Sequence, residues 1–179
     1  STYYELSPER GAHLLGQASH ESGNFKRSKE NLNYSWKGLM NTWPTRFKTE
    51  AEAREYHRQP VKIARKVYLR ESLGNETEED AENFIGRGWL QLTGKANYRS
   101  FASDMSVPDV MTDPSLVEDE YAFETAQWFF NKNGLFKIAD EGVNESVIKK
   151  ITKKINGGYH GLDDRINKIK KIHRWLRDL

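Results

Sequence analysis

The 179-residue chain contains no cysteine. This absence excludes disulfide bonds, cysteine-based zinc sites and thiol nucleophiles. The sequence also lacks any apolar run near the 18 or more residues that a membrane-spanning helix needs, so we expect no stable membrane insertion. Residues 1–8 have neither the basic start nor the apolar stretch of a secretory signal, and we therefore expect synthesis in the cytoplasm.

The composition is that of an ordinary globular protein, with 30% charged, 36% hydrophobic and 12% aromatic residues. The length predicts that residues 1–179 form a single domain with one core and no separate binding domain. The net charge of +2 is unevenly distributed, because residues 144–179 hold 10 Lys and Arg against 4 acids. Such a basic end either attracts nucleic acid, anionic lipid or an anionic cell wall, or is the solvated face of terminal helices.

Apolar residues at helical spacing predict a mainly α-helical chain. We expect helices at about 8–22, from the Thr49-x-x-Glu52 capping box, at 61–71, at 95–105, from Asp113-Pro114 to just before Gly134, from Asn144 onward, and from 162 to the C-terminus. Residues 74–83 are expected to be a polar connection. Residues 84–94 contain three glycines and are predicted to be an irregular or short β segment. Trp128 and Trp175 lie in strongly periodic stretches and are expected in the interior.

Glu21 is the first candidate catalytic residue, in the last turn of an otherwise apolar helix that ends at Gly23-Asn24. The negative end of the helix dipole disfavours the ionised carboxylate, which suits an acid that must carry a proton. The alternative is an ordinary surface acid. His20-Glu21 also begins like the zinc-protease pattern His-Glu-x-x-His, but position 24 is Asn, so that interpretation fails and no metal site is indicated.

Glu30 is the second candidate carboxylate. In one uninterrupted helix its nine-residue separation from Glu21 would place the two on opposite faces, about 13.5 Å apart along the axis. The turn at Gly23-Asn24 lets the chain fold back instead. An inverting glycosidase needs its two carboxyl groups about 6.5–9.5 Å apart, so the pair is compatible with that chemistry, although Glu30 taken alone is also typical of a solvated acid.

Three blocks occur in a fixed order along nearly the whole chain. They are Ala-Ser-His-Glu-Ser-Gly-Asn-Phe at 18–25, Gly-Arg-Gly-Trp-Leu-Gln-Leu-Thr-Gly at 86–94 followed by Asn97-Tyr98, and Ile-Asn-Gly-Gly at 155–158 ahead of Arg165. Together they resemble glycoside hydrolase family 19, which includes plant-type chitinases and many phage endolysins. The middle block is similar to the signature Gly-Arg-Gly-x-x-Gln-Leu-Ser/Thr of that family. The resemblance implies its mainly α, lysozyme-like fold.

The resemblance implies a division of catalytic roles. Glu21, beside His20, would protonate the glycosidic oxygen, Glu30 would be the base that activates water, and Thr93 would help to hold that water. In the plant chitinases the two acids lie farther apart in sequence, so the short spacing here is similar to the compact endolysin branch. The implied reaction is hydrolysis with inversion, without a metal or an organic cofactor.

The predicted substrate-binding residues are His20, Tyr34, Trp89, Gln91, Asn97, Asn156 and Arg165. The resemblance implies that Gln91, Asn97 and Asn156 hydrogen-bond the sugar chain and that Arg165 holds or tunes the catalytic carboxylates. Tyr34 and Trp89 flank the three blocks, and their rings either stack on sugar faces or belong to the core. The alternatives are that Gln91 and Asn97 only satisfy backbone groups and that Arg165 is a surface charge. Gly86, Gly88, Gly157 and Gly158 are expected to allow positive φ or close approach of the chain.

These features predict an endolysin that cuts the β-1,4 bond between N-acetylmuramic acid and N-acetylglucosamine in bacterial peptidoglycan. We expect it to bind the glycan strand and not nucleic acid. We also expect it to be a monomer. We expect it to be made in the host cytoplasm and to act in the periplasm or cell wall after a separate holin-type protein has permeabilised the membrane. The alternatives are a chitinase and a non-catalytic glycan-binding module; the presence of Glu21, Glu30 and Thr93 argues against the module.

Overall fold

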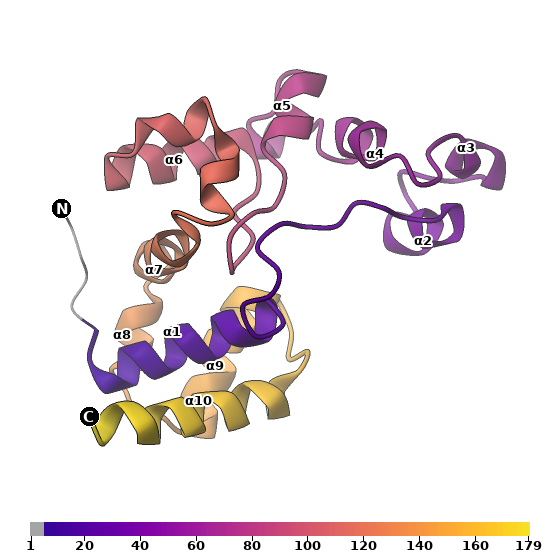
Figure 1. Cartoon of the computed structure of the whole chain (residues 1–179). Coiled ribbons are helices and arrows are strands. Elements are labelled where there is room, and N and C mark those ends of the chain that lie inside the picture. Colours follow the sequence, from indigo (N-terminus) through magenta and orange to yellow (C-terminus); the bar gives the residue numbers. More distant parts are fainter. Residues whose placement is uncertain (1–5) are drawn as a thin grey trace. The chain divides into compact units, whose positions relative to one another are not determined.

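The computed structural model describes residues 6–179, which form two compact units (Figure 1). Unit 1 contains the described part of residues 1–28, Gly88–Leu90 and Glu120–Leu179. Unit 2 contains Lys29–Arg87 and Gln91–Asp119. The expectation of a single catalytic domain stays a prediction.

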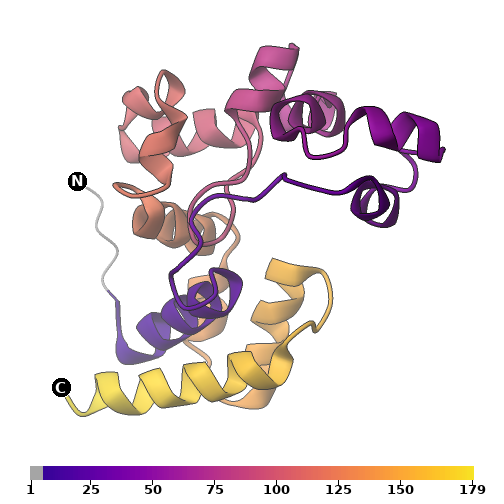
Figure 2. The same ribbon diagram turned by 45° about the vertical axis from the view of Figure 1, so that its right-hand side comes forward.

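Unit 1 consists of helices packed around α1 and α10. Its elements are α1 (Pro8–Glu21), α7 (Ala122–Lys132), α8 (Leu135–Ala139), α9 (Glu145–Asn156) and α10 (Leu162–Arg177). The first and last of these lie side by side in both views (Figures 1 and 2). Gly16 allows this close approach, because a Cβ there would collide with the side chain of Ile169 and lie 3.0 Å from its Cα.

The core of unit 1 is aliphatic and aromatic. Leu14, Phe130 and Ile151 are fully buried in one cluster, and Ile148 and Ile169 are buried in a second one between α1, α9 and α10. These residues occupy the apolar stripes that the sequence shows at helical spacing. Burial of these stripes fixes the C-terminal end of α1, where Glu21 lies, against the start of α10.

Unit 2 is built from short helices. Its elements are α2 (Trp36–Thr42), α3 (Glu50–Glu55), α4 (Pro60–Val67), η1 (Glu71–Leu73), α5 (Glu78–Asn83), α6 (Lys95–Met105), η2 (Pro108–Met111) and η3 (Pro114–Val117). Leu39, Phe47, Ile63, Val67 and Ile85 form the centre of a buried cluster in this unit. Helices this short have little stability alone, so the packing of this cluster must hold them in place.

The mainly α-helical prediction is confirmed. Ser7 caps α1 by accepting a hydrogen bond from the Arg10 amide, and Asn144 caps α9 in the same way through the Val147 amide. The helix expected at 95–105 is α6, with the same bounds. Thr49 caps α3, but Glu52 reaches the Lys48 amide rather than that of Thr49.

Four details of the sequence prediction were wrong. The helix expected at 61–71 ends at Val67, because the carbonyl of Tyr68 accepts from the Asn75 side chain and the Arg70 amide instead of continuing the helix. The expected polar connection contains α5, which begins at a capping box of Thr77 and Asp80. The expected helix from Asp113 is divided into η3 and α7. Trp175 is 62% exposed rather than internal.

The glycine-rich segment is irregular, as expected, and contains a tight turn. Arg87 and Leu92 exchange both backbone hydrogen bonds, at 3.0 and 2.7 Å, and a second isolated bridge joins Arg87 to Lys29. Among residues 6–179 these are isolated β-bridges and not strands. Within the same range no helix is long and apolar enough to cross a membrane.

Candidate active site

Glu21 ends α1 and is held by a buried arginine. The Arg165 guanidinium donates from Nη2 to Glu21 Oε1 at 2.6 Å, although 27% of the Glu21 side chain is exposed and Arg165 is fully buried. The interpretation of Arg165 as a surface charge is therefore wrong. Arg165 contacts the candidate acid Glu21, and the catalytic role of Glu21 stays a prediction.

The same guanidinium is fixed by a second set of acceptors. Nη1 donates to Gln17 Oε1 at 2.6 Å, and Nε donates to the His160 carbonyl at 2.9 Å. Gln17 lies one turn before Glu21 in α1, and its amide donates to Thr152 Oγ1 in α9 at 3.0 Å. Each polar group of this network has a hydrogen-bond partner within unit 1. The network therefore holds Glu21 in one orientation. Sequence reasoning missed Gln17, which looked like one polar residue on an apolar helix.

His20 faces the start of α10. Its Nδ1 lies 2.7 Å from Asp164 Oδ2, which also accepts from Lys168 at 2.7 Å. The Lys168 hydrogen bond, followed by that of His20, lowers the pKa of Asp164. Gly161, at φ +66°, leaves room for the imidazole, because a Cβ there would collide with the ring. His20 is therefore positioned beside Glu21 by both charge and shape.

The turn after α1 carries an aromatic contact. Gly23, Asn24 and Phe25 all have φ near +60°, which reverses the chain as the sequence predicted. The exposed ring of Phe25 packs on Trp89 with centroids 4.5 Å apart, and Trp89 also contacts Phe123. The predicted stacking residue Trp89 is thus partly exposed and supported on two sides.

Glu30 is held by two donors within unit 2. Its Oε1 accepts from the Gly86 amide and its Oε2 accepts from the Tyr68 hydroxyl, both at 2.7 Å. The Glu30 amide donates in turn to the Gly86 carbonyl at 2.9 Å. Burial, followed by the negative charge of Glu30, raises the pKa of Tyr68 well above its usual value, so this hydroxyl keeps its proton and remains a donor. Glu30 is not a free surface acid.

The signature block brings two more predicted residues next to this clamp. A Cβ on Gly86 would lie 2.7 Å from Gln91 Oε1 and 3.1 Å from Thr93 Oγ1, so these side chains pack directly on the glycine that binds Glu30. Thr93 donates to the Gln91 carbonyl at 3.0 Å, and Gln91 has a positive φ of 56°. Gly86 is therefore required for close approach, as expected, whereas Gly88 and Gly157 are required for positive φ.

The other predicted binding residues have structural roles of their own. The amide nitrogen of Asn97 donates to the Thr93 carbonyl at 2.8 Å, which is the backbone-satisfying alternative, and its oxygen stays accessible on α6. Asn156 is exposed and accepts from the His160 amide at 3.2 Å. Tyr34 is partly buried against Trp43, with ring centroids 5.0 Å apart. Their sugar-binding roles stay predictions.

Each unit thus gathers part of the predicted site. Unit 1 brings together Glu21, His20 and Arg165, and unit 2 brings together Glu30, Gln91 and Thr93. In unit 2 a cavity of about 170 Å³ borders Glu30. Sequence reasoning missed Tyr68, which fitted the helical apolar spacing of the stretch after Val61 and so looked like a core residue. Within residues 6–179 no group of three or more His, Cys, Asp or Glu side chains is placed to hold a metal ion.

Two comparisons with characterised proteins bear on this site. The chain is 37% identical over 170 residues to a glycosyl hydrolase family 19 domain-containing protein of Haemophilus influenzae; the match covers 92% of this chain and 77% of that protein. It is 28% identical over 149 residues to an endochitinase of Arabidopsis thaliana, covering 82% of this chain and 39% of the plant protein. No family model matches the chain.

Proposed function

This chain belongs to glycoside hydrolase family 19, and from that membership we propose that it hydrolyses the glycan strands of bacterial peptidoglycan. The bond attacked is the β-1,4 link between N-acetylmuramic acid and N-acetylglucosamine. The reaction is a single displacement with inversion, in which Glu21 is the general acid and Glu30 the general base.

In the proton-donation step the two carboxyl oxygens of Glu21 have different roles. Oε1 is held by Arg165, whereas Oε2 has no hydrogen-bond partner among residues 6–179. Oε2 therefore carries the proton and gives it to the glycosidic oxygen as the bond from that oxygen to the anomeric carbon breaks. Because Arg165 is itself fixed by Gln17 and His160, the carboxyl group keeps its direction throughout the reaction.

The base step relies on the clamp around Glu30. Each of its oxygens accepts one hydrogen bond, and a carboxylate oxygen has two lone-pair sites, so one remains on each oxygen for a water molecule. Glu30 takes a proton from this water as its oxygen attacks the anomeric carbon opposite the leaving group. Thr93, packed against the same Gly86, is placed to donate to or accept from the same water. The product has the inverted configuration, and solvent restores the proton on Glu21 and removes it from Glu30.

The observation that carries this proposal is the double clamp on Glu30. A solvated surface acid has no need for a half-buried tyrosine hydroxyl and a glycine amide that donate to its two oxygens. Fixing a charged side chain in this way costs conformational freedom, and it is typical of a group whose exact direction matters for chemistry.

Of the two alternatives, only the chitinase has support of its own. The name of the plant relative favours a chitinase, which would cut a polymer of N-acetylglucosamine alone. The non-catalytic module has no such support, because both carboxylates are present and held. For peptidoglycan the argument is the basic region at 144–179, which suits an anionic wall better than neutral chitin. The roles of a monomeric phage endolysin and of a separate holin-type partner are part of the same proposal.

Product analysis tests the proposed function. Purified peptidoglycan is digested, the new reducing ends are reduced with borohydride, and the fragments are identified by mass spectrometry, with chitin oligosaccharides digested in parallel. We expect reduced N-acetylmuramic acid ends, and in an unreduced digest NMR should show the α-anomer of the new reducing end before mutarotation. Reduced N-acetylglucosamine ends would reassign the bond, cleavage of chitin alone would establish the chitinase, and the absence of any new reducing end would refute the proposal.

A further inference from the structure

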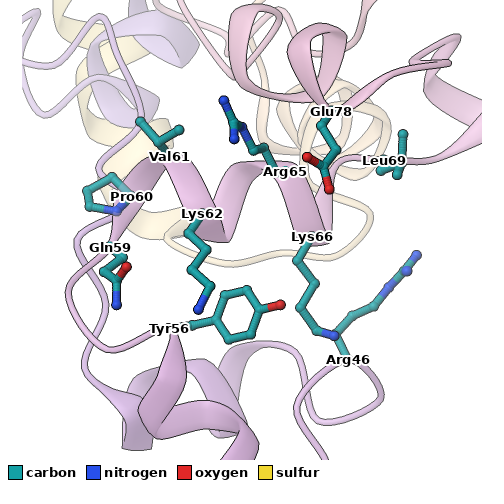
Figure 3. A pocket seen from close by; sticks show the side chains of 10 residues that line it. All are labelled: Arg46, Tyr56, Gln59, Pro60, Val61, Lys62, Arg65, Lys66, Leu69 and Glu78. Atoms are coloured by element: carbon teal, nitrogen blue, oxygen red, sulfur yellow. The ribbon is translucent and has the colours of Figure 1, made fainter.

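A large hollow lies against α4 in unit 2, outside the carboxylate clamp (Figure 3). Its volume is about 880 Å³, enough for a short peptide or a disaccharide. Tyr56 forms its floor in the close-up, with Lys62 and Lys66 extending from α4 toward the ring. Their ammonium groups lie 4.4 and 5.4 Å from the ring centroid. Nothing in the proposed reaction uses this hollow.

The charge of the hollow is positive, and two of its cations lack an acidic partner. Arg65 is paired with Glu82 at 2.6 Å and Lys66 with Glu52 at 2.9 Å. In contrast, Lys62 donates only to the neutral carbonyl of Glu55, at 2.9 Å, and among residues 6–179 no acid pairs with Arg46. These two positive charges are available to carboxylate groups of a ligand.

One acid, Glu78, also lines the hollow and limits this charge. Its negative charge helps to raise the pKa of Arg65, after the larger effect of the hydrogen bond that Arg65 donates to Glu82. The negative charge of Glu78 therefore acts on Arg65. The positive charges of Arg46 and Lys62 remain available to a ligand.

The hollow is also partly apolar. Val61 is 56% exposed and Leu69 is 41% exposed, and both line it together with the ring of Tyr56. Exposed aliphatic side chains beside unpaired cations match a ligand that has small aliphatic groups and carboxylates. A chain of N-acetylglucosamine alone offers no carboxylate.

The hollow and the cavity that borders Glu30 share part of their lining. Pro60 and Val61, at the start of α4, line both the large hollow and the cavity of about 170 Å³. A substituent on a sugar bound at Glu30 would pass the start of α4 to reach Lys62, and Arg46 lies farther along the hollow, near the end of Lys66 (Figure 3).

We propose that this hollow binds the stem peptide of peptidoglycan, the short chain of small aliphatic and carboxylate-bearing residues attached to N-acetylmuramic acid. The inference rests on the proposed function, because it places the sugar of the same strand at Glu30. Arg46 receives a carboxylate through its planar guanidinium, Lys62 receives a second one, and Val61 and Leu69 contact the methyl groups of alanine residues. The hollow then selects peptidoglycan over chitin, which has no peptide.

The test compares Arg46→Gln/Lys62→Gln with a matched control, Lys37→Gln/Arg99→Gln. The control removes the same charge from exposed positions of unit 2 outside the hollow. Three soluble substrates are used: peptidoglycan strands with stem peptides, the same strands stripped of peptides by an amidase, and chitin oligosaccharides. Binding of the muramoyl-tripeptide alone is measured by calorimetry on Glu21→Gln and on Glu21→Gln with the two substitutions in the hollow.

For the double variant we expect a KM about tenfold higher on peptide-bearing strands, an unchanged kcat, and no change on stripped strands or chitin. Binding of the muramoyl-tripeptide should weaken by a similar factor, and the control should match the wild type in every assay. Unchanged KM and unchanged peptide binding would overturn the inference, as would binding of polyphosphate in place of the peptide. If the wild type cleaves none of the glycans but still binds the peptide through Arg46 and Lys62, the proposed function fails and the peptide site stands.

Discussion

Arg165, fully buried in α10, donates a 2.6 Å hydrogen bond to Glu21 at the end of α1, 144 residues earlier in the chain. The same guanidinium holds Gln17 and the carbonyl of His160. One planar group therefore connects the candidate acid to a second residue of α1 and to the segment between α9 and α10. For Glu21 the sequence indicated the negative end of the helix dipole and, through the family resemblance, a contact with Arg165; the structure adds that this arginine is fully buried.

Arg165→Lys should impair catalysis although it keeps the charge. One ammonium group cannot reach all three acceptors of the guanidinium, so at least one buried acceptor loses its partner. We expect kcat to fall at least about tenfold and the free energy of unfolding to fall by about 1–3 kcal/mol. Steady-state kinetics and urea unfolding measure these effects. Arg174→Lys, on the exposed side of α10, is the control, and a wild-type kcat for Arg165→Lys would contradict the positioning role.

Tyr68→Phe should reduce turnover without unfolding the protein. It removes one of the two donors to Glu30, and a hydrogen bond to a charged group contributes about 1.5–3 kcal/mol, so we expect kcat to fall about tenfold or more with KM within about twofold. Because its pKa is raised, the Tyr68 hydroxyl is protonated at every assay pH, and the loss should not depend on pH.

Tyr98→Phe is the matched control for this prediction. Burial raises the pKa of Tyr98 to about 12, and its hydroxyl donates to the Ile85 carbonyl at 2.7 Å without contact to Glu30. It should lose about 1 kcal/mol of stability, as expected for a neutral hydrogen bond, and keep most of its kcat. Equal kcat losses in the two variants would show that the Tyr68 effect is only structural.

The stability of the fold should fall as the pH drops below about 6.5. His13 is fully buried, its Nε2 lies 2.9 Å from the Gly142 carbonyl, and burial lowers its pKa from 6.5. The unfolded state therefore binds a proton more readily, so the stability that neutral His13 contributes is complete above pH 6.5 and is lost as the pH falls toward the folded pKa.

The check is the melting temperature between pH 7.5 and 5.5. It should decrease in the wild type and change less in His13→Gln, which keeps an N–H donor but does not titrate. The carboxylates act in a lower range: Arg10 lowers the pKa of Asp140, and Lys168, then His20, lower that of Asp164, so their contribution is lost only below about pH 4. Parallel slopes for the wild type and His13→Gln would exclude His13 as the cause.

The basic face of α10 should help to hold the protein on an anionic cell wall. Lys170, Lys171 and Arg174 are exposed, whereas Lys168 is engaged by Asp164. Charges of this kind are screened over about 8 Å at physiological ionic strength. Replacing the three exposed residues with Gln should weaken wall binding in a pull-down assay and flatten its salt dependence, with cleavage of a short oligosaccharide unchanged. Normal binding with the same salt profile would leave these residues as a solvated surface.

The fold could be predicted where local signals were strong. Ser7 and Asn144 cap helices whose apolar stripes are continuous, so α1 and α9 were placed correctly. The prediction was wrong where tertiary contacts determine the end of a helix or the burial of a side chain. Asn75 ends α4 by binding a backbone carbonyl at its C-terminus, and Trp175 occupies a periodic position that the structure leaves exposed.

The site could be predicted only in part, for a related reason. The motifs and the resemblance pointed to Glu21, Glu30 and Thr93, and also to Arg165 and Gly86, which hold the two carboxylates. Two further holding residues, Tyr68 and Gln17, have no pattern of their own. Tyr68 lies 38 residues from Glu30, and Gln17 belongs to a network that α9 and α10 complete. Neither the partners nor their geometry follows from spacing along the chain.

Glu21 is proposed to be the proton donor of a glycoside hydrolase. The decisive measurement is the initial rate at which the Glu21→Gln variant forms new reducing ends from purified peptidoglycan. The amide has the same shape but cannot give up a proton to the glycosidic oxygen. We expect a folded variant with a melting temperature close to that of the wild type. Its initial rate should be lower than the wild-type rate by a factor of at least about 10²–10⁴. A folded Glu21→Gln variant with a rate within tenfold of the wild type would contradict it.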